Sequence, residues 1–223
     1  VLMRPATPES HADLERLLAP PDPEAMWEAY GFYRPDYDAG IFSDSHYWNE
    51  VAARAGLGEV PVAEAVACEN SGLLEADPEM VALVKGLIGE GYSVGILSNI
   101  PTTLAGQVRE KHTWLEDCAA VTFSCDIGLA KPHPEAYRVA VDALSAQPKD
   151  THFFDDRIDY IEGGYPGANP LDTAFFTERR TKQARFTAFG MTRVEGSDDR
   201  TLYMRGTGTQ HHIHVTRKAP KQR

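Results

Sequence analysis

The chain has 223 residues, of which 42% are hydrophobic, so it can bury one substantial core together with a small appended unit. The formal net charge of −11 and the lack of any apolar run long enough to span a membrane, or of a visible signal peptide, are typical of a soluble cytoplasmic protein. Cys68, Cys118 and Cys125 lack CxxC spacing, which predicts free thiols in a reducing cytoplasm.

Residues 8–73 read as a series of short helices. The spacing of apolar residues predicts helices near Glu9–Leu18, near Pro23–Gly31, and from Ser43 or Asp44 to Ala55. Aromatic residues are dense in this segment, and at helical spacing they favour a core over a ligand platform. They are Trp27, Tyr30, Phe32, Tyr33, Tyr37, Phe42, Tyr47 and Trp48.

A helix, a strand and a second helix follow in order. Asp77 is the expected N-cap of a helix over Pro78–Gly91, with proline in the first position. Tyr92–Asn99 then predicts a buried parallel strand that ends in the hydroxyl of Ser98 and the amide of Asn99, and a helix begins at Thr102. Such a strand end running into a helix N-terminus suits a phosphate, although Ser-Asn is also a common turn.

The segment Gly128–Tyr137 places Lys131 ahead of Pro132 and Pro134, before a helix that runs through Leu144. The prolines fix the backbone and so give the lysine a defined direction. Lys131 could therefore meet an anion shared with the neighbouring strand ends, whereas a lone surface lysine is usually only solvated.

Two adjacent carboxylates close the next apolar run. Thr151–Phe154 predicts a short buried strand, with Asp155 and Asp156 at its C-terminal tip, where open α/β sheets place their ligand sites. Like charges side by side repel, and Mg²⁺ would neutralise them. The alternative is a solvated strand-to-loop corner with an Asx turn.

Leu97-Ser98-Asn99, Gly128–Pro132 and Phe153–Gly163, in this order and spacing, resemble the haloacid dehalogenase-like (HAD) hydrolase superfamily, in phosphatase-like members with a small helical cap. The resemblance implies a three-layer, Rossmann-like α/β fold with a parallel sheet, a helical cap at 8–73 and a core at 74–163. It implies that Ser98 binds the transferred phosphoryl group, that Lys131 pairs with it, and that Asp155 and Asp156 hold Mg²⁺. Together with Asn99, Ser98 and Lys131 would bind a small phosphate monoester such as a sugar phosphate.

The front of the chain departs from this family. Family members begin with a strand that ends in an aspartate nucleophile, but residues 1–7 look like the remnant just beyond it, and the first carboxylate is Glu9. Covalent aspartyl-phosphate chemistry is therefore not expected of the sequence as given. A truncated reading frame and a non-catalytic remnant that binds an anion or Mg²⁺ are the two interpretations. An incomplete sheet would also expose apolar edges and favour a homodimer.

Residues 164–223 form an atypical C-terminal segment that opens on the breaker-rich run Gly164–Pro170. Residues 1–172 carry a net charge of −18 and residues 173–223 one of +7. Scattered arginines without an aromatic stacking platform argue against nucleic-acid binding.

Phe186–Met191 and Leu202–Val215 resemble a half-module of a vicinal-oxygen-chelate (glyoxalase or dioxygenase-like) domain. His211, His212 and His214 would be its transition-metal ligands, in a site that dimerisation of the tail would complete. A histidine-rich strand without metal is the favoured interpretation, because such a module needs ligands from two halves.

Overall fold

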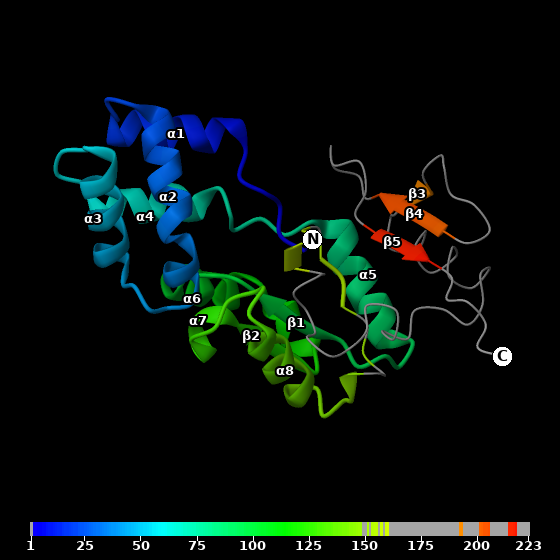
Figure 1. Ribbon diagram of the computed structural model, residues 1–223. Coiled ribbons are helices and arrows are strands. Elements are labelled where there is room, and N and C mark those ends of the chain that lie inside the picture. The colour runs from blue at the N-terminus through cyan, green and yellow to red at the C-terminus, as the bar shows by residue number, and fades with distance from the viewer. Residues whose placement is uncertain are drawn as a thin grey trace.

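The computed structural model describes residues 2–148, 151, 153–155, 157, 159 and 160, and the backbone of three strands at 192–193, 201–205 and 214–217. Figure 1 shows α1 to α4 on one side, and α5 to α8 with β1 and β2 on the other, with the end of α2 meeting the second group near α7. We call the first group, α1 to α4, the cap, and the second group, α5 to α8 with β1 and β2, the core.

The cap contains α1 (Pro8–Leu18), α2 (Pro23–Asp38), α3 (Asp44–Ala55) and α4 (Val62–Ser71). Side chains of Thr7, Asp22 and Ser43 accept backbone N–H bonds at the first three N-termini. The predicted end of the second helix at Gly31 is wrong. Its later turns bury Tyr37 and Asp38, and this burial outweighs the cost of about 1 kcal/mol that glycine brings to a helix interior.

Aromatic side chains build the interior of the cap, as the sequence predicts. Tyr37, Tyr47 and Trp48 are fully buried, and the rings of Tyr37 and Tyr47 stack with centroids 4.1 Å apart. Phe32 is the exception, since it is 60% exposed and lies under the guanidinium of Arg54.

The core runs through α5 (Pro78–Gly89), β1 (Gly95–Ser98), α6 (Thr102–Lys111), a 3-10 helix (Thr113–Asp117), β2 (Ala120–Phe123), α7 (Ser124–Ile127) and α8 (Pro134–Ala143). The strands β1 and β2 are parallel, with Ser98 opposite Phe123 at their carboxyl ends. Helix α8 packs against both strands. Asp77 caps α5 as predicted, with Pro78 in its first turn.

Two strand predictions need correction. The first strand begins at Gly95 and not at Tyr92, and it is half-buried and not buried. The described residues of Thr151–Phe154 do not form a strand. A strand needs a partner for its backbone, and among the described residues β1 pairs only with β2, so the Phe153 segment has no ladder to join. Phe153 instead meets the edge of Tyr137 on α8, with ring centroids 5.1 Å apart.

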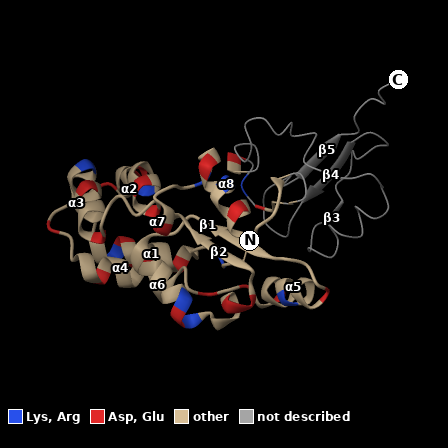
Figure 2. Cartoon of the chain, turned by 90° about the horizontal axis from the view of Figure 1, so that it is seen from below, with Lys and Arg blue, Asp and Glu red and all other residues tan. Residues whose placement is uncertain are grey.

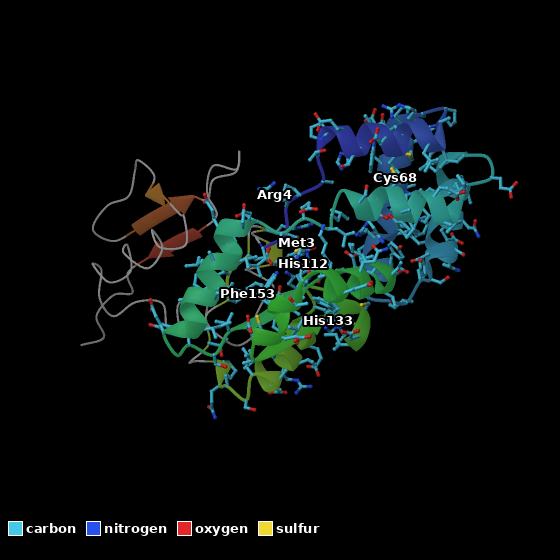
Figure 3. All side chains as sticks on the ribbon, turned by 180° about the vertical axis from the view of Figure 1, so that it is seen from behind. Met3, Arg4, Cys68, His112, His133 and Phe153 are labelled. Carbon is cyan, nitrogen blue, oxygen red and sulfur yellow. The ribbon has the colours of Figure 1, made fainter. Side chains whose placement is uncertain are left out.

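The chain crosses twice between cap and core, and the two crossings are bonded to each other. Met3 and Ala76 form an antiparallel bridge, Arg4 N–H donates to the carbonyl of Glu75 at 2.7 Å, and Asp77 N–H donates to that of Leu2 at 2.9 Å. Figure 3 labels Met3 and Arg4 at this junction and Cys68 within the cap. The two segments that connect the cap to the core are therefore hydrogen-bonded to each other.

Strands β3 (Thr192–Arg193), β4 (Thr201–Arg205) and β5 (His214–Arg217) form an antiparallel sheet in sequence order. Phe186–Met191, Gly164–Pro170, His211 and His212 lie outside the described residues, as does the side chain of His214. The resemblance to a vicinal-oxygen-chelate half-module stays a prediction.

Acidic and basic residues are interspersed over the helices of cap and core (Figure 2). Within the described ranges, no helix combines the length and apolarity needed to cross a membrane. The three cysteines are free, as the sequence predicts, and each is half-buried.

Candidate functional site

Asn99 holds the backbone of Lys131. Its side-chain Nδ2 donates to the Lys131 carbonyl at 2.8 Å, and its Oδ1 accepts from Lys131 N–H at 2.7 Å. Asn99 lies directly after β1, and Lys131 lies in the loop before α8. This pair of hydrogen bonds therefore joins two segments that are 32 residues apart. The amide therefore fixes the point from which the lysine side chain starts.

The Lys131 ammonium meets a carboxylate inside the protein. Its Nζ lies 2.5 Å from Asp155 Oδ2, and the two side chains are only 8% and 7% exposed. The other oxygen, Asp155 Oδ1, accepts from Arg157 N–H at 3.0 Å. This bond forms the Asx turn that was the alternative prediction for this corner. This corner is buried rather than solvated, so the turn accompanies the ion pair instead of replacing it.

Aromatic rings surround the ammonium. Lys131 Nζ lies 4.9 Å from the ring centroid of Tyr160 and 5.6 Å from that of Phe153. Figure 3 labels Phe153 in the core. Such faces attract a cation and limit its hydration, which strengthens its field at the site. Tyr160 is a site residue that the sequence analysis missed.

Of the predicted site residues, Asn99, Lys131 and Asp155 are brought together. Ser98 precedes Asn99 at the carboxyl end of β1 and is half-buried. Asp156 lies outside the described residues.

The cap reaches this site through Asp38, at the end of α2. Its carbonyl accepts a hydrogen bond from the buried hydroxyl of Ser124, and the same hydroxyl oxygen accepts from Ile100 N–H at 2.8 Å. The carboxylate of Asp38 accepts from Arg34 Nε at 2.7 Å. Burial raises the pKa of Asp38 to about 6, opposed by the charges of Arg34 and Lys131.

A second contact between cap and core lies at the N-terminus of α6. Asp44 Oδ2 accepts from the Thr103 hydroxyl at 2.6 Å, and Asp44 Oδ1 accepts from the Tyr37 hydroxyl at 2.8 Å. Helix α6 has no capping side chain and no acidic residue in its first turn. The cap therefore brings a negative charge to the positive end of this helix.

The chemistry of Asp155 suits a hard cation. Carboxylate oxygens are the ligands that Mg²⁺ prefers, and one or two of them suffice because this ion keeps several of its waters. Within the described ranges no group of three or more histidine, cysteine or acidic side chains gathers around a metal position. A site at Asp155 would accordingly be completed by Asp156, by water and by the substrate.

A family model described as haloacid dehalogenase-like hydrolase matches residues 4–164. A sesquiterpene phosphatase of Aspergillus oryzae is 25% identical over 125 residues, which are 56% of this chain and 63% of the relative. A phosphatase of Mycobacterium tuberculosis, MT3486, is 28% identical over 120 residues, 53% of this chain and 55% of the relative. The chain thus spans less than two thirds of these relatives.

An (R)-citramalate synthase of Streptomyces coelicolor is 47% identical over 51 residues, which are only 21% of this chain and 10% of the synthase. Among solved structures, a variant HAD family enzyme from Bacteroides thetaiotaomicron, in complex with magnesium and inorganic phosphate, superposes with a TM-score of 0.60. The two chains are 21% identical, and the superposition covers 73% of this chain and 83% of the enzyme. At this identity the similarity shows a shared fold.

Proposed function

The chain belongs to the haloacid dehalogenase-like hydrolase family, and we propose that its site binds and hydrolyses a phosphate monoester of a small molecule, such as a sugar phosphate. The observation that carries this proposal is the Lys131 ammonium, buried beside Asp155 and fixed at its backbone by Asn99. A buried, oriented cation at the carboxyl ends of parallel strands is suited to an anion.

Each predicted residue has a task in this proposal. Lys131 offsets the charge on the phosphoryl oxygens, and the Ser98 hydroxyl donates a hydrogen bond to one of them. Helix α6 begins two residues beyond Ile100 and has no side-chain cap, so the backbone N–H groups of its first turn would favour the same negative charge. Asn99 does not need to touch the substrate, because its amide is occupied by the backbone of Lys131.

Asp155 and Asp156 would hold Mg²⁺. When bound, this ion supplies Lewis-acid stabilisation of the charge on the transferred phosphoryl group. Asp155 already accepts from Lys131 and from Arg157 N–H, so its orientation is set by the protein.

Turnover needs a nucleophilic carboxylate at the same place. The first seven residues contain none, and the cap carboxylate of Asp38 is bonded to Arg34. The sequence as given would therefore bind the phosphoryl group with little or no hydrolysis, and a strand ending in aspartate ahead of Val1 would restore it.

A phosphatase assay with MgCl₂ and a panel of phosphate monoesters tests this proposal on two proteins. One is the chain as given, and the other carries an upstream strand that ends in aspartate. We expect hydrolysis by the extended protein alone, and its loss on Lys131→Met. Phosphate binding without hydrolysis in either protein would support a non-catalytic remnant, and neither binding nor hydrolysis would refute the proposal.

A further inference from the structure

We propose that the Tyr160 hydroxyl donates a hydrogen bond directly to the bound phosphoryl group, as an uncharged ligand beside Lys131. This inference rests on the proposed function, because it concerns the same anion site. It assigns a substrate contact to a residue of the Phe153–Gly163 segment for which the sequence predicts no role.

The hydrogen bonds around Asn99 fix the direction in which Tyr160 can donate. Asn99 Oδ1 accepts from Lys131 N–H, so the other end of the amide must be the NH₂ group. That group donates to the Lys131 carbonyl and, at 3.2 Å, to the Tyr160 hydroxyl oxygen. Tyr160 is therefore an acceptor towards Asn99.

The Tyr160 hydroxyl donates no hydrogen bond to any acceptor in the part of the chain that the structure describes. Hydrogen bonding lowers the free energy of a half-buried donor. A negatively charged phosphate oxygen is a strong acceptor for such a bond. The hydroxyl lies against Asn99, next to Ser98 in the chain, and its ring faces the Lys131 ammonium.

The surroundings keep this group in place and protonated. The ring lies between two cations, with the Arg157 guanidinium 4.2 Å and Lys131 Nζ 4.9 Å from its centroid. The Tyr160 carbonyl accepts from the Tyr137 hydroxyl at 2.5 Å, which ties the segment to α8. Burial raises the pKa of Tyr160, against the opposing effects of Arg157 and Asn99, so the donor proton is retained at neutral pH.

Calorimetric titration with inorganic phosphate in MgCl₂ tests the proposal on the full chain. Tyr160→Phe keeps the ring between its two cations and removes only the hydroxyl. We expect its Kd for phosphate to rise about tenfold. Tyr92→Phe makes the same chemical change at an exposed position between α5 and β1 and should leave Kd unchanged.

A third variant separates donation to phosphate from support of Asn99. 4-Aminophenylalanine at position 160 keeps an N–H donor but is a poor acceptor for the Asn99 amide. We expect it to bind phosphate more tightly than Tyr160→Phe does, because donation is restored. Binding as weak as that of Tyr160→Phe would overturn the proposal and leave Tyr160 as a support for Asn99.

Two other results also contradict the proposal. An unchanged Kd in Tyr160→Phe, with binding lost in Lys131→Met, would overturn the role of Tyr160 and retain the anion site. Failure of the unmodified chain to bind phosphate would overturn this inference together with the proposed function.

Discussion

Lys131 and Asp155 illustrate how strongly a single buried pair can constrain a site. Removing two charges from water is costly, and the cost is recovered only when geometry and hydrogen bonds are good. Here Asn99 anchors the cation and Arg157 N–H supports the anion. A bound phosphoryl group would compete with Asp155 for the same ammonium, so the pair is both a structural element and a part of the proposed anion site.

Lys131→Met should destabilise the fold by about 3–5 kcal/mol, because it leaves the carboxylate of Asp155 buried without its partner. Urea unfolding measures this loss. The matched control is the double variant Lys131→Met with Asp155→Asn, which removes both charges and should recover a large part of the stability. Equal stability of the two variants would show that the pair is not buried as described.

Asp38 should give the fold a distinct pH dependence. Its pKa rises from 3.8 to about 6 on folding, so between these values the folded protein holds more protons at this side chain than the unfolded chain does. Its contribution to the free energy of unfolding therefore falls as pH rises through this window and stays low above it. Compared with Asp38→Asn, the wild type should lose about 2–3 kcal/mol between pH 4 and pH 7.

Urea titrations of both proteins across this range test the Asp38 prediction. Asp36→Asn, at an exposed position of the same helix, is the matched control. Parallel stability curves for wild type and Asp38→Asn would contradict the prediction.

Helix N-termini were the most predictable features of this chain: the predicted starts at Pro23, Pro78 and Thr102 are those of α2, α5 and α6. The predicted capping role of Asp77 depends on neighbours within three residues, and the sequence shows these neighbours directly. The strand expected at Thr151–Phe154 fails for the opposite reason, because strand formation depends on a partner that is distant in sequence. The four-residue strand β2 was missed since so short a run carries little periodicity.

Asp77→Ala should cost about 1 kcal/mol of stability, since the Asp77 carboxylate accepts from Glu79 N–H and Met80 N–H at the start of α5. Chemical denaturation provides the measurement. Asp77→Ser, which retains a capping oxygen, is the control and should keep most of the stability. An alanine variant as stable as the wild type would show that the cap contributes nothing.

The contact between α3 and α6 should hold the cap against the core. Thr103→Val removes the hydroxyl that donates to Asp44 and keeps the side-chain shape, so it should cost about 1–2 kcal/mol. Amide hydrogen exchange in the first turns of α3 and α6 should rise in this variant. Thr113→Val, at an exposed position, should change neither quantity, and unchanged exchange in Thr103→Val would rule out this role.

At the scale of the whole molecule, the site is assembled from long-range contacts. The loop after β1, the loop before α8 and the Asp155 segment were each identifiable from sequence, because their residue types and order carry the family pattern. Ser124, Asp38 and Tyr160 were not, since their importance comes from partners elsewhere in the chain. Ser124 and Asp38 are 86 residues apart, and no local pattern indicates that pairing.

The cap and the core are connected by more than the chain crossings. Asp38 meets Ser124, Asp44 meets Thr103, and the amide of Asn70 on α4 donates to Gln107 on α6 at 3.0 Å. These contacts position the buried charges of α2 beside the core site.

A crystal structure of the chain with MgCl₂ and tungstate, a heavy tetrahedral oxyanion, tests the central claim most directly. We predict the anion within hydrogen-bond distance of Lys131 Nζ and the Ser98 hydroxyl, with the metal bound to Asp155. An anion bound elsewhere, or a metal that avoids Asp155 while Lys131 stays paired with that carboxylate, would contradict the account.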